Sequence, residues 1–298
     1  MKISVHITFY IEDIKNKKKL QNFNKVLNSF LGISKNTYIF IHTNNFKLKI
    51  NKKNTKLIYH SLTNQNPLRL TWKCRDLISE QKNDYDYFIC SEDDGIFSKK
   101  NFNYWLKYSK KLFKYKYNPG FLRTEKSTKT HKLWVVDQLV QLDKHIIINN
   151  EKFVVVNNPY FAMWIMDKST LKKFIKSKFW NLNNWRGFNS FTKLYDREKS
   201  AVGWHALNMN YFKATVLPIT KNKIRKECYF PHQPNKYVAE TGMIALNIDN
   251  ILSKNTKKFV DKKLSKFQVI INEIKFFIYW KLRINFKNLK KEFKIKSF

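Results

Sequence analysis

The first 115 residues alternate between short apolar runs and segments whose apolar residues recur at helical spacing. The apolar runs predict strands at residues 2–9, 38–42, 56–60 and 87–90. Helical spacing predicts helices over residues 15–31 and 66–81, and a further helix is expected over residues 99–115. The order β-α-β-β-α-β with short connections predicts an α/β fold, in which helices flank a mixed, Rossmann-like sheet.

The middle of the chain is less regular. Strand-like segments occur at residues 120–124, 133–142, 145–148, 153–156 and 215–219. We expect residues 119–166 to complete the sheet and to add a hairpin. Asp167 is expected to cap a helix that ends near residue 177, and residues 195–211 are expected to be helical.

The character of the chain changes near residue 253. From Ile251 to the end there are 13 lysines and one arginine against three acidic residues. Apolar residues recur there at helical spacing, at Phe267, Ile270, Ile271, Ile274, Phe277, Ile278, Leu282, Phe286 and Leu289. This predicts a basic amphipathic helical extension over residues 251–298, after a domain over residues 1–250 with halves at 1–115 and 116–250. Such a helix suits an anionic membrane surface, and packing on the domain or on a second copy is the alternative.

Composition narrows the functional classes. The 298 residues are 43% hydrophobic, so the chain can bury a large core as one large domain or two small ones. The net charge of +36 would suit nucleic acid, but only seven of the basic residues are arginines and 51 are lysines. Arginine is favoured for bidentate contacts with bases and phosphates, so we expect no specific nucleic-acid partner. The positive field still favours phosphate-bearing substrates.

The expected location is cytoplasmic. Three widely spaced cysteines form no paired motif, which favours a reducing compartment. No signal-peptide pattern precedes the first predicted strand, and no run of about 18 apolar residues predicts a membrane span. With the basic extension, this favours a peripheral position on the inner face of the cell membrane.

The most informative motif is Glu92-Asp93-Asp94, which follows the apolar strand at residues 87–90 and precedes Gly95, a residue that allows a tight turn. Three adjacent carboxylates repel one another unless a positive charge lies among them. Mg²⁺ or Mn²⁺ would supply it, because hard cations prefer carboxylate oxygen and fill their remaining positions with phosphate and water. The motif therefore indicates a metal-bound diphosphate at the end of a strand. An acidic turn closed by glycine is the alternative.

This arrangement resembles the GT-A class of nucleotide-sugar glycosyltransferases, in which a Rossmann-like half ends in an acidic DxD motif that binds metal and donor diphosphate. Glu92-Asp93-Asp94 stands in that place, with Glu92 where the first Asp is usual, and the resemblance covers roughly residues 1–245 in architecture. It implies a metal-dependent enzyme that moves a sugar from a nucleotide-diphosphate donor to a glycan or lipid-linked acceptor, in cell-surface polysaccharide synthesis.

The resemblance also implies roles for single residues. Asp94 and Glu92 are expected to hold Mn²⁺ or Mg²⁺, and Asp93 is expected to lie near the metal or the donor ribose. His232, in a loop near the end of the domain, is expected to complete the metal site. For His232, a loop histidine without a special role is the alternative.

In inverting members of the class a carboxylate deprotonates the acceptor hydroxyl, and the candidates here are Glu198 and Asp196. A helix-capping or ion-paired carboxylate is the alternative for each, and a retaining mechanism stays open. Residues expected near the donor are Thr8, Phe9, Tyr10, Arg69 and Lys73. Aromatic rings expected to stack on the acceptor are Trp164, Trp185 and Trp204, with a core position as the alternative for Trp164.

Three other functions account for part of these observations. A sugar-nucleotide nucleotidyltransferase would share the fold, but such enzymes usually carry an N-terminal glycine-rich loop, and the first glycine here is Gly32. A basic nucleic-acid-binding protein or metal nuclease would use the charge, although arginines are few and no recognition motif is present. A non-catalytic membrane adaptor would use the basic extension alone.

Overall fold

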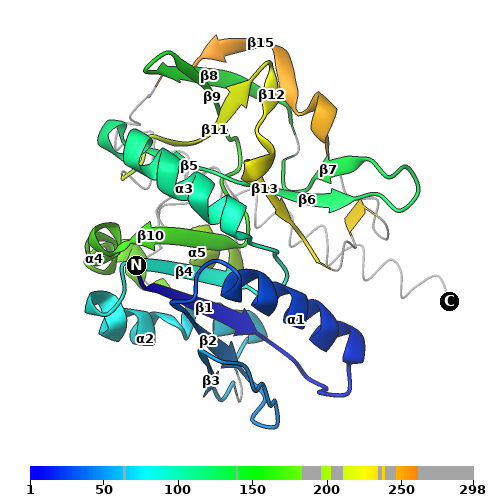
Figure 1. The fold of residues 1–298 in the computed structure, drawn as a ribbon, viewed down its shortest axis with the longest axis vertical. Helices are drawn as coiled ribbons and strands as arrows, with labels where there is room; N and C mark the ends of the chain where they lie inside the picture. Colours follow the sequence, from blue (N-terminus) through cyan, green and yellow to red (C-terminus); the bar gives the residue numbers. More distant parts are fainter. Residues whose placement is uncertain are drawn as a thin grey trace, which may run out of the picture.

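The computed structural model describes residues 1–62, 65–138, 140–182, 196–202, 211–233, 237–238 and 246–260. A five-stranded sheet in the order β10-β4-β1-β2-β3 forms its N-terminal half (Figure 1). The strands span Ile3–Phe9 (β1), Thr37–Thr43 (β2), Thr55–Tyr59 (β3), Tyr87–Glu92 (β4) and Met163–Asp167 (β10). The first four are parallel, and β10 is antiparallel to β4. The predicted α/β class and the four N-terminal strands are confirmed.

The helix α1 (Lys17–Leu31) covers one face of this sheet (Figure 1). Its apolar stripe buries Phe23, Val26, Leu27 and Phe30, as expected for a helix that packs one face on a sheet. The central strand β1 is buried at all seven positions, because parallel strands are covered on both faces. A ligand can therefore approach this sheet mainly at the edge where the carboxyl ends of the strands lie.

The single helix expected over residues 66–81 is wrong, because the segment is broken. It consists of the 3-10 turn η1 (Pro67–Trp72), the helix α2 (Arg75–Glu80) and the 3-10 turn η2 (Gln81–Asn83). The side-chain oxygen of Asn66 accepts a hydrogen bond from the backbone N–H of Leu68 and starts the first turn. The break brings the Arg75 guanidinium to 4.2 Å from the centre of the Trp72 ring.

The C-terminal half contains α3 (Lys99–Leu112) and two further sheets. A six-stranded sheet runs β12-β11-β9-β8-β15, with β5 beside β11, and a four-stranded sheet runs β13-β6-β7-β14. The strands span Tyr117–Pro119 (β5), Leu122–Lys126 (β6), Leu133–Val135 (β7), Leu142–Ile148 (β8), Glu151–Val155 (β9), Ala214–Thr220 (β11), Lys223–Ile224 (β12), Tyr229–Pro231 (β13), Leu246–Asn247 (β14) and Leu252–Lys258 (β15).

Two more helices and four 3-10 turns complete the described part of the chain. Asp167 accepts a hydrogen bond from the backbone N–H of Thr170, which confirms it as the cap of α4 (Lys168–Ile175). The predicted helix over residues 195–211 contains α5 (Asp196–Val202), and residues 203–210 lie outside the described part. The 3-10 turns are η3 (Phe113–Tyr115), η4 (Lys178–Trp180), η6 (Lys226–Cys228) and η7 (Ile248–Asn250).

Three expectations for the second half need correction. Within residues 119–166 only β10 joins the first sheet, whereas β8 and β9 form the expected hairpin in a separate sheet. The strand expected over residues 133–142 is β7 followed by the start of β8. The helical extension is wrong over residues 252–258, which form β15, because β8 offers an edge for parallel pairing and the exposed lysines of β15 suit a sheet edge. Residues 261–298 lie outside the described part.

Two apolar clusters hold the fold together. The larger packs α1 and α3 against the sheets, and the smaller surrounds the buried Trp164 between β4, β10 and α4. The cysteines Cys74, Cys90 and Cys228 are buried free thiols. Within the ranges that the structure describes, no helix has both the length and the apolar character needed to cross a bilayer.

Candidate functional site

The three carboxylates lie where the strand order of the first sheet reverses. From β1 the chain builds outward to β2 and β3, then crosses to the other side of β1 to form β4. Glu92 is the last residue of β4, opposite Thr8 of β1, and Asp93 and Asp94 follow it. In open α/β sheets the crevice at the carboxyl ends of such neighbouring strands is the usual ligand site.

Cationic side chains and a hydroxyl from other elements face the first two carboxylates. The Nε atom of Arg197, on α5, is 3.6 Å from Oε2 of Glu92, and the hydroxyl of Tyr160 donates to Oε1 at 2.9 Å. Lys19, on α1, lies 3.9 Å from Oδ2 of Asp93. These contacts offset part of the repulsion between the acids. They come from three separate segments of the chain, which carry Arg197, Tyr160 and Lys19.

Arg123, on β6, places a further positive charge beside the site. Its side chain is only 6% exposed and forms an ion pair with Asp137, with Nε 2.8 Å from Oδ2. The guanidinium also lies 5.5 Å from the ring centre of Tyr160, within cation–π range. The charges of Asp94 and Glu92 help to raise the pKa of Arg123 against the effect of burial, so this cation is permanent.

His232 joins the third carboxylate to a buried glutamate. Its Nε2 lies 3.0 Å from Oδ2 of Asp94, and its Nδ1 lies 2.5 Å from Oε1 of Glu125. The parallel pairing of β13 with β6 sets this position, since the N–H of His232 donates to the carbonyl of Thr124 at 2.8 Å. The backbone N–H of Gln233 donates to the carbonyl of Asp94 at 2.6 Å, which fixes the loop on the acidic turn.

The electrostatic environment separates the carboxylates into two kinds. Burial raises the pKa of Glu92 to about 7, although Arg197 opposes the shift. Burial and the neighbouring charge of Asp94 likewise raise the pKa of Asp93 to about 7. Burial would also raise the pKa of Asp94, but the hydrogen bond from His232 and that residue's charge outweigh it and lower the value. Asp94 is therefore the carboxylate that is most firmly ionised.

The same contacts act on His232. Burial alone would lower its pKa, but the hydrogen bonds to Asp94 and Glu125 outweigh burial and raise it. Carboxylate oxygens at both ring nitrogens favour the doubly protonated ring. His232 could bind a metal through Nε2 only after giving up the proton at that nitrogen.

The residues at this site fit a cation that takes most of its ligands from water and phosphate and few from the protein. Oδ1 of Asp94 is buried and has no hydrogen-bond partner within the described ranges, and an unpaired buried carboxylate oxygen is costly. No group of three or more His, Cys, Asp or Glu side chains in those ranges has the arrangement of a complete metal cage. Mg²⁺ commonly takes only one or two protein carboxylates and completes its shell with water and phosphate. Asp94 suits that mode of binding.

The residues expected near the donor lie in different environments. Thr8 is almost fully buried beside Glu92. Phe9 is 0% exposed and stacks on Phe23 at 3.9 Å, so the expectation that it contacts a nucleotide is wrong. Tyr10 is half-buried, and its hydroxyl donates to Glu12. Arg69 and Lys73 lie on or beside η1, and Arg69 is 3.6 Å from Asp196 rather than beside the carboxylate cluster.

Both candidate bases lie on α5, a helix that is docked tightly beside the acids. Asp196 accepts ion-pair contacts from Arg69 at 3.6 Å and Lys199 at 3.9 Å. Glu198 is half-buried on the same helix. Arg197 stands between them in sequence and reaches Glu92. The structure thus brings the helix that carries both candidates to the site.

The aromatic residues proposed for the acceptor do not form a platform in the described structure. Trp164 is 0% exposed, and its indole N–H donates to the carbonyl of Ser200 at 3.0 Å. Its expected stacking role is wrong, because a sugar ring cannot reach it, and it instead anchors α5. Trp185 and Trp204 lie outside the described residues.

Six residues around the acids were not singled out from the sequence, and these are Lys19, Arg123, Glu125, Asp137, Tyr160 and Arg197. Arg123 and Glu125 carry a readable signal, since opposite charges two positions apart share one face of a strand. The positions of the other four depend on contacts between distant segments.

No protein-family model matches the chain, and no curated protein is similar to it. Function is therefore inferred from the chemistry and geometry of the site.

Proposed function

We propose that this protein is a metal-dependent glycosyltransferase of GT-A architecture that uses a nucleoside-diphosphate sugar. The observation that carries the proposal is Asp94, which follows the end of a central parallel strand at the point of strand-order reversal, with one buried carboxylate oxygen left unpaired. The position suits a nucleotide ligand, and the unpaired oxygen suits a divalent cation on its diphosphate.

The surrounding residues have distinct roles in this proposal. Asp94, with Glu92, would hold Mg²⁺ or Mn²⁺, and neutral His232 would be a third ligand. Asp93 would contact the metal through water or bind the ribose. A bound divalent ion would neutralise the charge that develops on the leaving diphosphate. Arg123 holds the site's geometry and charge through its ion pair with Asp137.

On the acceptor side, Glu198 or Asp196 would take the proton of the attacking hydroxyl, in an inverting transfer. The ion pair between Arg197 and Glu92 supports this role, because it holds α5 against the donor site. The acceptor would be a glycan or a lipid-linked glycan in surface polysaccharide synthesis, at the cytoplasmic face of the membrane.

Calorimetric titration with UDP, GDP, CDP and ADP, each with and without Mn²⁺, tests the donor site. We expect one nucleotide to bind in the presence of Mn²⁺ and Asp94→Asn to weaken it at least about tenfold, which is about 1.4 kcal/mol. Asp143→Asn, on the exposed side of β8, is the matched control and should bind as the wild type does. Metal-independent binding, or binding of none of the four, would overturn the proposal.

A nucleotide that passes this test then names the sugar donors to try. Release of that nucleoside diphosphate from one of its sugar conjugates, with transfer to an acceptor glycan seen by mass spectrometry, is the expected activity.

A further inference from the structure

A long stretch of the chain carries no acidic residue. Between Asp13 and Asp76 the sequence contains twelve lysines and two arginines but no Asp or Glu. This stretch forms α1, β2 and β3, at the free edge of the five-stranded sheet. Arg75 is buried and Arg69 pairs with Asp196, so the exposed charge of this side comes from lysine.

Two aromatic rings lie exposed within this basic region. Phe46 is 72% exposed and Tyr59 is 52% exposed. Their ring centres are 6.1 Å apart in an edge-to-face contact, and the Lys47 ammonium lies 5.8 Å from the Phe46 ring centre. Since neither ring contributes to a core, the pair presents apolar surface to solvent at a place where the fold does not require it.

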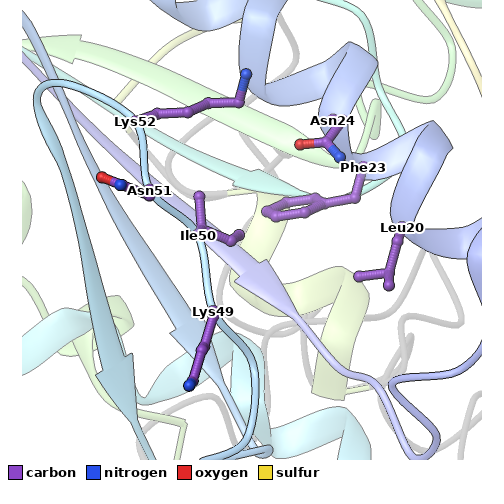
Figure 2. Close-up of a pocket in the computed structure, with 7 residues that line it drawn as sticks. All are labelled: Leu20, Phe23, Asn24, Lys49, Ile50, Asn51 and Lys52. Atoms are coloured by element: carbon purple, nitrogen blue, oxygen red, sulfur yellow. The ribbon is translucent and has the colours of Figure 1, made fainter.

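A shallow recess lies between α1 and the connection from β2 to β3. Figure 2 shows Phe23 of α1 and Ile50 of the β2–β3 connection pointing toward each other across it, with Lys49 and Lys52 on either side of Ile50. The Lys52 ammonium donates to Oδ1 of Asn28 at 2.8 Å, which ties the connection to α1. The recess therefore has apolar walls and a lysine rim.

We propose that this side of the protein docks on an anionic phospholipid bilayer. We name as the basic aromatic surface the residues Phe46, Lys47, Lys49, Lys53 and Tyr59. Each lysine near an anionic bilayer contributes about 1 kcal/mol of attraction, and aromatic rings settle at the headgroup level. The two rings supply insertion, and the lysines supply attraction, because the chain between Asp13 and Asp76 contributes no acidic residue to oppose it.

The chemistry of the surface favours lipid over nucleic acid. Sequence-specific nucleic-acid contacts use the bidentate guanidinium group, and the two arginines of the stretch are engaged within the protein. The surface acts independently of sugar transfer and differs from the 251–298 segment, whose described strand β15 lies at the opposite end of the molecule from β3 (Figure 1).

Co-sedimentation of the full chain with vesicles tests the surface. Vesicles of phosphatidylcholine with 30% phosphatidylglycerol, about the range of anionic membranes, are compared with phosphatidylcholine alone. We expect binding to the anionic vesicles that weakens as salt rises. Lys49→Glu/Lys53→Glu should weaken binding roughly 30-fold or more, and Phe46→Ser/Tyr59→Ser should reduce the part that persists at high salt.

Lys129→Glu/Lys144→Glu is the matched control, because these exposed lysines lie on the β6–β7 connection and on β8, outside residues 13–76 and 251–298, and give the same change in net charge. It should bind within about twofold of the wild type. An equal loss in the control variant, or unchanged binding in Lys49→Glu/Lys53→Glu, would overturn the proposal. Binding of a short single-stranded DNA that the same surface variants abolish, without vesicle binding, would also overturn it and assign the surface to nucleic acid.

Discussion

His232 and Asp94 are separated by 138 positions in the chain, yet the imidazole Nε2 lies 3.0 Å from Oδ2 of the carboxylate. The pairing of β13 with β6 creates this contact, and the same pairing sets His232 against the fully buried Glu125. The acidic turn at the end of β4 is thus completed by a strand pair from the other half of the molecule. The candidate site cannot form until both halves have folded.

Glu125→Ala should therefore destabilise the whole protein. The substitution removes one of the two carboxylates that bind the His232 ring and leaves the backbone N–H of Val238 without its 2.8 Å acceptor. Breaking a buried charge pair typically costs about 3–5 kcal/mol, and urea unfolding would measure the loss. Glu80→Ala, at an exposed position of α2, should change the free energy of unfolding by less than about 0.5 kcal/mol. Equal effects would show that the Glu125–His232 pair is not structural.

Gly95 has a packing role that differs from the expected one. A tight turn with positive φ is not what requires glycine here, because the backbone of Gly95 is outside that region. A Cβ atom would instead lie 1.9 Å from Cζ of Phe230. Gly95→Ala should cost about 1–3 kcal/mol by overpacking and should weaken metal-dependent nucleotide binding, because Asp94 is the adjacent residue.

Gly32→Ala is the comparison for that measurement. The nearest atom to its added Cβ would be 3.4 Å away, which is close to ordinary contact. Its unfolding free energy should stay within about 1 kcal/mol of the wild type. A stable Gly95→Ala variant with normal nucleotide binding would show that the Phe230 ring can move aside.

The sequence predicted those elements whose signals are local. The order of the first four strands and α1 follows from short apolar runs and one helical stripe, and the acidic motif is adjacent in sequence. The features that the sequence did not predict depend on contacts between segments that are far apart in the chain. Nothing near Leu252 indicates that β8 accepts it as a parallel partner. Arg123 and Tyr160 meet Glu92 because separate strands and loops converge on it, which periodicity does not encode.

Arg75 offers a test of how α5 is held at the site. Its side chain is 3% exposed and donates to the carbonyls of Phe179, Trp180 and Ser200 at 2.8–3.2 Å. Burial lowers its pKa to about 10, so it stays charged at neutral pH. Arg75→Met removes a donor from each of the three carbonyls, although that of Ser200 keeps the indole N–H of Trp164, and should cost about 3 kcal/mol or more of unfolding free energy.

Arg75→Lys should recover little of that loss, because an ammonium group cannot reproduce the planar fork of donors. Arg69→Met is the control, since this exposed arginine makes a single 3.6 Å ion pair with Asp196. It should cost less than about 1 kcal/mol. A similar loss in the Arg69 and Arg75 variants would contradict the anchoring role.

A chain of hydrogen bonds that joins two buried histidines and a half-buried one predicts how the protein responds to acid. Ser4 donates to Oε1 of Gln81, so its oxygen accepts from Nε2 of His6 at 2.9 Å. Nδ1 of His6 must then accept from Nε2 of His42 at 3.0 Å, and Nδ1 of His42 from Nε2 of His60 at 2.8 Å. Each inner ring therefore accepts at one nitrogen, and protonating it would break the chain.

Burial lowers the pKa of His6 to about 3 and that of His42 to about 2. In the unfolded chain both rings titrate near the ordinary value of about 6.5. Below that pH the unfolded state binds protons that the folded state does not, so stability is complete above about pH 6.5 and falls steadily toward pH 3. Each ring should account for about 2–3 kcal/mol of the loss between pH 7.5 and 4.5.

Urea unfolding at these two pH values, on the wild type and on His42→Gln, measures this loss. The variant should be less stable than the wild type at pH 7.5, because it gives up hydrogen bonds of the chain, but it should lose about 2–3 kcal/mol less on acidification. His131→Asn, at an exposed position with positive φ that asparagine tolerates, should keep the wild-type pH dependence. An identical loss in His42→Gln and wild type would mean that carboxylate protonation governs acid unfolding and that the histidine chain does not.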